Sequence, residues 1–392
     1  MIDGPRACKE SEFEDAVALT NSIFRARSDQ DIRTDYPLVF DPSKREYMRV
    51  VCVDNRVVAH VPLAPREVIA NGDRLTVGII SPTSTHPEYR HRGYGTLCLQ
   101  DCIEIMEQSE WPISVLWTIE PTFPFYQQVG WEAVGTQGHV YRLLPAEREL
   151  FVPGDYEVIG YSPSDSEHLD AIIELHEAEP YRVARSRMEY EALFTLHKTR
   201  TLLALRDGAV AAYLIVGAGV NKSGWIEGGG EEAGLETLAH QVLREEESEC
   251  VQVVLPLTST ALGSLMSSKK PGLACPVEEA AGVGYQMMRV NSLDALLRRM
   301  TVHLSERSVG LWAEVCLVCE DNDEAVTLTL KDGSVELVSE RKSPAVVLNR
   351  RQLTQLIFGS HAGLVTPDCG SAAAVLRQIF PFYFPMWELD HS

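Results

Sequence analysis

The segment TSTHPEYRHRGYGT, residues 83–96, constrains the fold of this chain more than any other feature. It follows an apolar, strand-like run and precedes an apolar stripe with helical spacing between Leu99 and Met106. The predicted order is therefore a strand, a tight basic turn and a helix. Gly93 and Gly95 allow a close approach of the backbone to a ligand, and the first turn of a helix leaves amide groups unpaired at the positive end of its dipole. Such a turn suits phosphate oxygens.

Two other phosphate-binding patterns do not fit this segment. The dinucleotide fingerprint requires three glycines and an early strand of a parallel sheet, whereas this strand ends a series of hairpins. The Walker pattern requires a Gly-Lys-Ser/Thr sequence, which is absent. Arg90 and Arg92 add positive charge to the turn. The alternative is a basic loop that only connects a strand to a helix.

Two parts of the chain share the same landmarks. A helix is predicted over residues 11–25, where Ser11 and Glu14 have capping-box spacing, and a hairpin turn is predicted at Asp54 and Asn55. A further turn at residues 71–72 makes a meander of two hairpins. A second capping box begins at residue 164 and a second hairpin turn at residue 207, each 153 residues after its counterpart. This spacing favours an internal duplication.

The last quarter of the chain has a different pattern. Short strands are predicted at 315–320, 325–330 and 335–338, followed by a helix around 351–358 and the aromatic tail FPFYFPMWELDHS. We therefore expect three domains, with boundaries at 1–148, 149–291 and 292–392.

The turn RHRGYG, behind a strand and the sequence THPEY, resembles the pyrophosphate loop of the GNAT superfamily of acetyltransferases. The downstream segment SVLWTIEPTFPFYQQVGWEAVG is similar to the fifth strand and following helix of that superfamily. The layout of the whole chain resembles the enhanced-intracellular-survival type. This resemblance implies an α/β (α+β) protein with tandem GNAT folds of mixed, mostly antiparallel sheets, followed by an α+β sterol-carrier-like domain.

The resemblance also implies acetyl-CoA as cosubstrate and assigns it a binding site. The residues carried over for the coenzyme are Thr83, Ser84 and Thr85 for the pantetheine arm and Arg90, His91, Arg92, Gly93, Tyr94, Gly95 and Thr96 for the pyrophosphate. The second GNAT-like unit has IEGGGEE at residues 226–232, with glycines but no arginine. Because its carboxylates would repel pyrophosphate, we expect that this unit has lost coenzyme binding.

Catalytic roles follow from the same resemblance. Tyr126 matches the general acid of the family, and the terminal carboxylate of Ser392 matches its general base. Glu120 and a water chain are alternative bases. His60 and His86 have suitable chemistry, but a lone histidine near a strand is more often structural. The aromatic and acidic segment 24–42 is expected over the acceptor, with Phe24, Asp31 and Tyr36 beside Glu120 as acceptor-binding residues.

The composition of the chain limits the classes of ligand and partner that we expect. The chain has 35 basic and 56 acidic residues and a formal charge of −21, which disfavours nucleic acid and favours small cationic molecules.

The start has no signal sequence and no apolar run is long enough to span a membrane, so neither secretion nor a membrane is indicated. The nine scattered cysteines fit a reducing cytoplasm. A metal is disfavoured, because the CxxC at residues 316–319 has no second ligand pair.

The predicted function is therefore that of a cytoplasmic N-acetyltransferase. It would move an acetyl group from acetyl-CoA to a primary amine of a small molecule or a peptide by direct attack. The resemblance also suggests a homo-oligomer, with a hexamer as one form. The alternative is a non-enzymatic acyl-CoA or lipid sensor, in which the C-terminal domain holds an apolar ligand.

Overall fold

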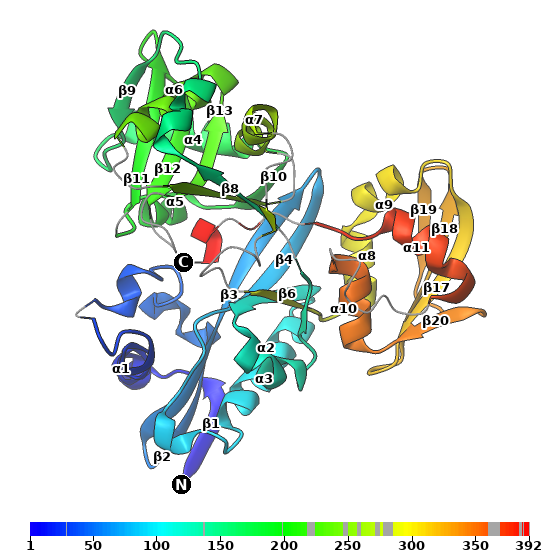
Figure 1. Cartoon of the computed structure of the whole chain (residues 1–392). Helices are drawn as coiled ribbons and strands as arrows, with labels where there is room; N and C mark the ends of the chain where they lie inside the picture. The colour runs from blue at the N-terminus through cyan, green and yellow to red at the C-terminus, as the bar shows by residue number, and fades with distance from the viewer. Residues whose placement is uncertain are drawn as a thin grey trace. The chain divides into compact units, whose positions relative to one another are not determined.

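We analysed a computed structural model of the chain, shown in Figure 1. The structure describes residues 1–28, 30–135, 138–197, 199–217, 224–245, 250–256, 260–270, 275–276, 285–359, 369–383, 386 and 388–391. The chain divides into two compact units. The first contains residues 1–67, 71–135 and 284–382, and the second contains residues 68–70, 136–283 and 383–392.

A mixed sheet dominates the first unit, with the strand order β1-β2-β3-β4-β6-β16-β7 and with β5 paired to β3. Its strands are β1 (Ile2–Ala7), β2 (Met48–Val53), β3 (Arg56–Ala70), β4 (Asp73–Ile80), β5 (Ser84–Thr85), β6 (Ile113–Thr118), β7 (Glu132–Ala133) and β16 (Tyr285–Val290). The meander predicted from the hairpin turns is confirmed, because β2, β3 and β4 follow one another in the sheet. The turn residues Asp54, Asn55, Asn71 and Gly72 all have positive φ angles, as such tight turns require.

Helices cover both faces of this sheet. They are α1 (Phe13–Phe24), α2 (Tyr94–Gln108) and α3 (Phe123–Gln127). Figure 1 shows α1 and α2 on opposite sides of β3. The apolar stripe of α2, which includes Cys98, Leu99 and Cys102, is fully buried against Val61 and Leu63 of β3. The predicted helix after the basic turn is therefore confirmed.

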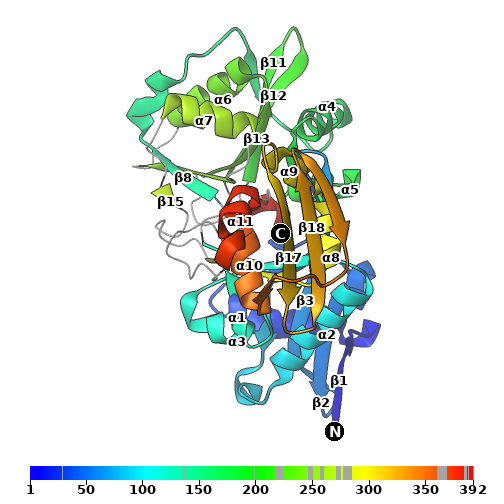
Figure 2. The ribbon, with the colours of Figure 1, turned by 90° about the vertical axis from the view of Figure 1, so that its right-hand side faces the viewer.

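The C-terminal part of the first unit has its own sheet, ordered β19-β18-β17-β20. Its elements are α8 (Leu293–Arg299), α9 (Thr301–Arg307), β17 (Trp312–Cys319), β18 (Glu324–Lys331), β19 (Ser334–Val338), β20 (Ala345–Leu348), α10 (Arg350–Phe358) and α11 (Ala373–Ile379). Figure 2 shows α8 and α9 behind this sheet, on one of its faces. The predicted strands and helix of this region are confirmed, whereas its sterol-carrier-like character stays a prediction.

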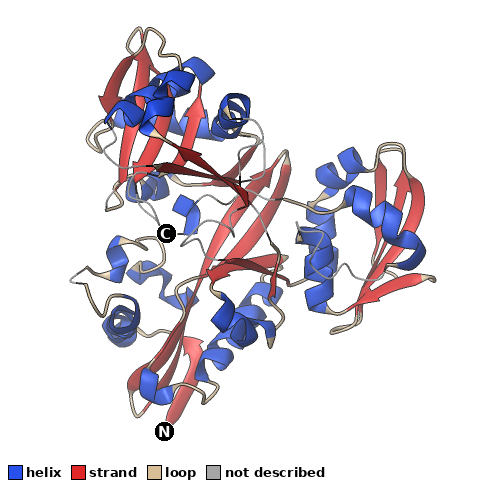
Figure 3. Cartoon of the chain, in the orientation of Figure 1, coloured by secondary structure: helices blue, strands red, loops and turns tan. Residues whose placement is uncertain are grey.

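The second unit is also built on a sheet, with the order β15-β8-β14-β13-β12-β11-β9. Its elements are β8 (Gly138–Leu143), β9 (Glu157–Gly160), α4 (Ser166–Glu177), β10 (Tyr181–Ala184), α5 (Arg187–Leu193), β11 (Thr199–Arg206), β12 (Ala209–Gly217), β13 (Trp225–Gly230), α6 (Glu232–Glu245), β14 (Val251–Pro256), α7 (Ala261–Lys269) and β15 (Cys275–Pro276). Figure 3 shows the alternation of helices and strands in both units. None of the described helices is long and apolar enough to cross a membrane.

The proposed duplication agrees with the helix positions. Helix α4 begins and ends 153 residues after α1, and the turn at Asp207 has the same left-handed backbone as the turn at Asp54. The predicted caps are displaced. The Lys9 amide donates to the Glu12 carboxylate at 2.9 Å ahead of α1, and the Asp165 carboxylate caps α4 by accepting from the His168 amide at 3.2 Å. The three predicted domain boundaries stay a prediction.

Each sheet contains a strand that the predicted boundaries place in the neighbouring domain. Strand β8 pairs along its whole length with β14 in the sheet of the second unit. Strand β16 pairs with β6 and β7 in the sheet of the first unit. The chain thus leaves the first sheet after β7 and returns to it through β16.

A buried charge network holds the end of the chain in the second unit. Arg185 makes a two-fold hydrogen bond to Glu227, at 3.0 and 2.6 Å, and its Nε donates to Asp390 at 2.9 Å. The side chains of Arg185, Glu227 and Asp390 are each 1% exposed. Although burial alone would raise it, the pKa of Glu227 lies below its ordinary value because the Arg185 guanidinium is adjacent. The network therefore fixes the short helix of residues 388–391 to β13.

Replacement of Arg185 by leucine should destabilise the second unit. It removes the Arg185 charge from between two buried carboxylates, which costs about 3–5 kcal/mol. The free energy of unfolding, measured in urea at pH 7, should fall accordingly. Arg187→Leu is the control, because Arg187 forms an exposed ion pair with Asp170, and it should change stability little. Equal losses in the two variants would contradict the role of the buried network.

Candidate active site

The basic turn forms an open cradle at the start of α2. Gly93 has a φ of 82° and is the residue that caps the helix, without a side-chain hydrogen bond. The first helical bond runs from the Leu97 amide to the Gly93 carbonyl at 2.9 Å, so the amides of residues 94–96 have no acceptor inside the helix. A Cβ atom on Gly93 would meet no atom within 4 Å. The backbone is therefore exposed where an anionic ligand can reach it.

Arginine side chains flank this cradle. Arg90 Nε donates to the Thr85 carbonyl at 3.3 Å, and the Arg92 guanidinium lies 5.0 Å from the centre of the Tyr89 ring. Both arginines are exposed to solvent. The amides, the helix dipole and these two cations are the chemical groups that a pyrophosphate requires. The residues present thus fit the phosphate part of a coenzyme.

The sheet opens directly in front of the cradle. Strands β4 and β6 pair in parallel through Ile79 and Val115, and β6 continues for three more residues. After β4 the chain turns to the other side, because Ser84 and Thr85 of β5 pair with His60 and Ala59 of β3. Among the described residues, the pairing between the two central strands thus ends at Ile79. An extended ligand can use the backbone groups along this opening.

Tyr126 lies in α3, next to the opening. Its side chain is 8% exposed and belongs to the same apolar core as Cys98 and Leu99 of α2. Burial raises the pKa of the Tyr126 phenol above its ordinary value of 10.0, and the neighbouring Thr83 hydroxyl opposes part of this rise. The phenol is therefore protonated at neutral pH, as a proton donor must be.

Two contacts connect α3 to the cradle. Gln128 Nε2 donates to the Thr96 hydroxyl at 3.1 Å. A Cβ atom on Gly95 would lie 3.2 Å from the Phe125 ring, so the glycine allows this ring to approach the first turn of α2. The ring of Phe125 also contacts Tyr126 edge to face at 4.9 Å. The phosphate cradle and the phenol thus belong to one packed structure, and the sequence analysis did not identify Phe125 and Gln128 as its connectors.

A buried polar cluster lies on the α1 side of the opening. The Thr20 hydroxyl donates to the Ala16 carbonyl at 3.0 Å and lies 3.4 Å from His60 Nδ1 and 3.2 Å from Ser84 Oγ. Burial lowers the pKa of His60 to about 3, so its ring is neutral and a weak base. This geometry favours the structural interpretation of His60 over a role as general base.

The predicted acceptor residues lie in several different segments of the first unit. Phe24 is 44% exposed at the end of α1. Asp31 accepts from the Arg33 amide and forms an ion pair with the Arg33 side chain at 2.7 Å, which holds the pKa of Asp31 below its ordinary value. Glu120 lies on the surface at the start of a short helix, residues 120–122. Ser392 lies outside the described residues. The roles of these residues and of Tyr36 stay predictions.

The corresponding turn of the second unit differs from the cradle. Gly230 has a φ of 105°, and a Cβ atom there would lie 2.3 Å from the Ala211 carbonyl oxygen. The absence of a side chain at Gly230 therefore allows β13 to lie close to β12. Glu231, next to the start of α6, accepts from the Tyr156 hydroxyl at 2.9 Å and pairs with Arg206. A carboxylate occupies the place of the arginines, in agreement with the expected loss of coenzyme binding, which stays a prediction.

Comparisons with known proteins identify the class of the first part of the chain. Residues 5–134 match the family model described as an acetyltransferase (GNAT) domain. A search of the curated proteins found no match. Among solved structures, the chain is similar to a GCN5-related N-acetyltransferase from Anabaena variabilis, with a TM-score of 0.70 and 14% identity over 97% of each chain.

Two further solved structures agree over nearly the whole length. A GCN5-related N-acetyltransferase from Kribbella flavida has a TM-score of 0.68 and 20% identity, and the match covers 96% of this chain and 90% of that one. Eis1 from Mycobacterium abscessus has a TM-score of 0.64 and 13% identity, with 99% and 98% covered. At these identities the likeness concerns the fold, and it confirms the predicted α/β class with mostly antiparallel sheets. The chain therefore carries a GNAT acetyltransferase domain, which supports acyl transfer as its general chemistry.

Among the residues that the structure describes, no group of three or more His, Cys, Asp and Glu side chains is arranged to hold an ion. The arrangement around the opening is instead one of backbone amides, cations and a phenol.

Replacement of Gly93 by alanine should weaken coenzyme binding. A left-handed backbone costs a non-glycine residue about 1–2 kcal/mol, so an alanine favours a loop conformation in which the amides turn away from the ligand. We expect the Kd of CoA, measured by titration calorimetry, to rise about fivefold to thirtyfold. Gly160→Ala is the control, because that glycine has no left-handed backbone and its added Cβ would meet nothing within 4 Å. An unchanged Kd for Gly93→Ala would remove the cradle from the coenzyme site.

Proposed function

We propose that this protein is an N-acetyltransferase that moves the acetyl group of acetyl-CoA to a primary amine by direct attack. The observation that carries the proposal is the junction of three features: the cradle at the start of α2, the end of the β4–β6 pairing, and the buried phenol of Tyr126. A coenzyme held by its pyrophosphate at the cradle extends its arm along the opening towards the phenol. The thioester supplies the activated acetyl group.

In this reaction the acceptor nitrogen loses two protons and the leaving sulfur gains one. The incoming amine must be neutral, so a base first removes a proton from its ammonium form. Its nitrogen then attacks the thioester carbonyl carbon, a C–N bond forms and the C–S bond breaks. Tyr126 gives its phenolic proton to the leaving sulfur, and the nitrogen, which is positively charged after its attack, loses its second proton to solvent to leave the amide. The Tyr126 phenolate then recovers a proton from solvent. No acyl-enzyme is required, so positioning and proton transfer supply the catalysis.

Tyr126 suits the role of acid because burial favours its protonated form. For the base, we propose the terminal carboxylate of Ser392, with Glu120 and a water chain as rivals. Assembly into an oligomer stays a prediction from the resemblance, and a cytoplasmic location stays a prediction from the cysteine content and the N-terminal sequence.

Tyr126→Phe should lower kcat by about 10²- to 10⁴-fold, the usual contribution of a general acid, and leave the affinity for acetyl-CoA within twofold. Acetylated products are measured by mass spectrometry with a panel of diamines, aminoglycosides, amino acids and peptides. Tyr141→Phe is the control, since Tyr141 is a buried tyrosine in the core of the second unit. Equal losses of kcat and coenzyme affinity would exclude Tyr126 as the acid.

The pH dependence of kcat tests the role of Tyr126 independently. Because the pKa of Tyr126 is raised above 10.0 and the acid must be protonated, the fall of kcat caused by its ionisation should lie above pH 10. This fall should be absent in the residual activity of Tyr126→Phe. A fall of kcat below pH 10 that is also seen in Tyr126→Phe would be caused by the ionisation of another group.

Removal of Ser392 alone should separate the candidate bases. The deletion shifts the terminal carboxylate by one residue and retains the anchored Asp390. We expect kcat to fall about 10²-fold or more while the urea unfolding curve is unchanged. Glu120→Gln should have little effect on kcat. The reverse result, in which only Glu120→Gln lowers kcat, would make Glu120 the base.

A further inference from the structure

Thr83 carries a buried hydroxyl group that has no hydrogen-bond partner among the residues that the structure describes. A buried hydroxyl without a partner costs free energy, because it has lost its bonds to water and gained none in return. This cost is offset where the group finds its partner in another state of the protein, such as a charge that develops during a reaction. The groups near the Thr83 hydroxyl therefore indicate its role.

Strand β5 and the residue before it send their side chains alternately to the two sides of the opening. Ser84 Oγ lies 3.2 Å from Thr20 Oγ1, so Ser84 faces α1. Thr85 faces the other side, because its Oγ1 would lie 3.1 Å from a Cβ atom on Gly95 at the start of α2. Since side chains alternate along an extended segment, Thr83 faces the same side as Thr85, towards α2 and α3.

Tyr126 lies on that side of the opening. The Phe125 ring would lie 3.2 Å from the same Cβ atom on Gly95, and it contacts the Tyr126 ring edge to face. The Thr83 hydroxyl is close enough to the phenol to lower the pKa of Tyr126, against the larger rise that burial causes. No charged side chain among the described residues contributes to the shift of this pKa. The hydroxyl is thus a neutral polar neighbour of the phenol.

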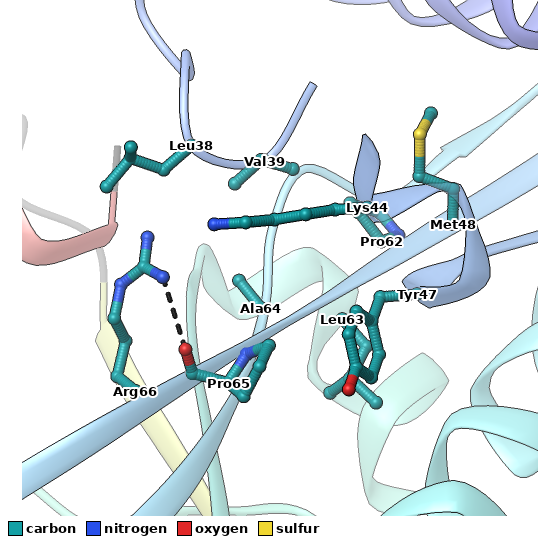
Figure 4. A pocket seen from close by; sticks show the side chains of 10 residues that line it. All are labelled: Leu38, Val39, Lys44, Tyr47, Met48, Pro62, Leu63, Ala64, Pro65 and Arg66. Atoms are coloured by element: carbon teal, nitrogen blue, oxygen red, sulfur yellow. Dashed lines mark hydrogen bonds between the residues drawn. The ribbon is translucent and has the colours of Figure 1, made fainter. Parts of the chain in front are cut away.

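A small hollow beside β3 gives this hydroxyl no alternative partner. Figure 4 shows the hollow, in which the Arg66 guanidinium donates to the Pro65 carbonyl at 3.1 Å. All ten lining residues lie between positions 38 and 66 of the chain. The lining therefore includes neither Thr83 nor Tyr126.

The two protonation states of Tyr126 differ in how strongly they attract a hydrogen-bond donor. With the phenol protonated, the Thr83 hydroxyl has no partner. Once the phenol has given up its proton, its oxygen is negatively charged, and hydrogen bonds to charged acceptors are stronger than those to neutral ones. An interaction that forms only as this charge develops lowers the reaction barrier without tightening the binding of the substrates.

We propose that Thr83 is a positioning residue for acetyl transfer, whose hydroxyl donates a hydrogen bond to the Tyr126 oxygen as the phenol gives its proton to the leaving sulfur. In this step the phenolic O–H bond breaks and an S–H bond forms, while Thr83 keeps its own proton. The inference rests on the proposed function and adds to it a residue that acts through Tyr126. The resemblance assigned Thr83 to the pantetheine arm through its backbone, and the role proposed here belongs to its side chain.

Thr83→Val removes the hydroxyl and retains the size of the side chain. We expect kcat for the acceptor with the highest turnover to fall about tenfold, while the KM for acetyl-CoA changes less than twofold. Thr83→Ser, which retains the hydroxyl, should recover most of the kcat, and Thr83→Ala should show the same loss as Thr83→Val. Thr201→Val is the matched control, because Thr201 of β11 also has a buried hydroxyl without a partner among the described residues, and it should leave kcat unchanged.

A double substitution shows which group the hydroxyl acts on. In the Tyr126→Phe background, Thr83→Val should change the remaining kcat less than twofold, because no phenolate forms there. A tenfold fall in both backgrounds would place the hydroxyl on the thioester carbonyl oxygen instead and would overturn the inference. A wild-type kcat for Thr83→Val in the otherwise unchanged protein would also overturn it.

A measurement without turnover distinguishes failure of this inference from failure of the proposed function. A fluorinated tyrosine in place of Tyr126 ionises at lower pH than tyrosine, and its titration is followed by fluorine NMR in the full-length protein. Thr83→Val should raise the midpoint of this titration by about one pH unit, because a tenfold stabilisation of the charged form is lost. A raised midpoint in a protein that acetylates no amine supports the contact, so that only the proposed activity fails. An unchanged midpoint in an active enzyme overturns the inference and leaves acetyl transfer intact.

Discussion

The parting of β4 from β6 determines where everything else in the candidate site lies. Ser84 and Thr85 pair with β3, so the parallel ladder ends at Ile79 and Val115 while β6 continues. Backbone amides and carbonyls along such an opening need partners, and buried ones without partners cost free energy comparable to a lost hydrogen bond. A ligand with its own amides can supply those partners. The same change of direction brings the chain to the start of α2, so the opening and the cradle are consequences of one backbone path.

Most of the local geometry follows from short-range signals in the sequence. The two glycines and two arginines before an amphipathic stripe predict a helix start with exposed amides, and α2 begins at Tyr94 after a left-handed Gly93. Turn residues at Asn71 and Gly72 predict the β3–β4 hairpin, because tight hairpin turns require positive φ angles. The resemblance also led to Tyr126, which the fold places beside Thr83. These features depend on a few adjacent residues, which is why the sequence alone predicts them.

Contacts between residues that are far apart in the sequence could not be predicted in this way. Strands β8 and β16 carry no local pattern that identifies their partners, and only the complete fold assigns each to its sheet. The buried Arg185, Glu227 and Asp390 are separated by 42 and 205 residues and carry no local pattern either. Predicting such contacts requires the tertiary structure, because their energy comes from desolvation at a shared buried position.

The net charge of the chain and the charges close to a site have different effects on which ligands bind. A net charge of −21 creates a field that draws cations towards the surface, and by itself it predicts a polycationic acceptor. The field is screened within about 8–10 Å at physiological ionic strength, however, so the nearest charges decide which ligand a given site favours. At the cradle the nearest charges are those of Arg90 and Arg92, which are exposed beside the start of α2. Their positive charge acts locally against the overall field, so the cradle favours an anionic group although the chain as a whole is acidic.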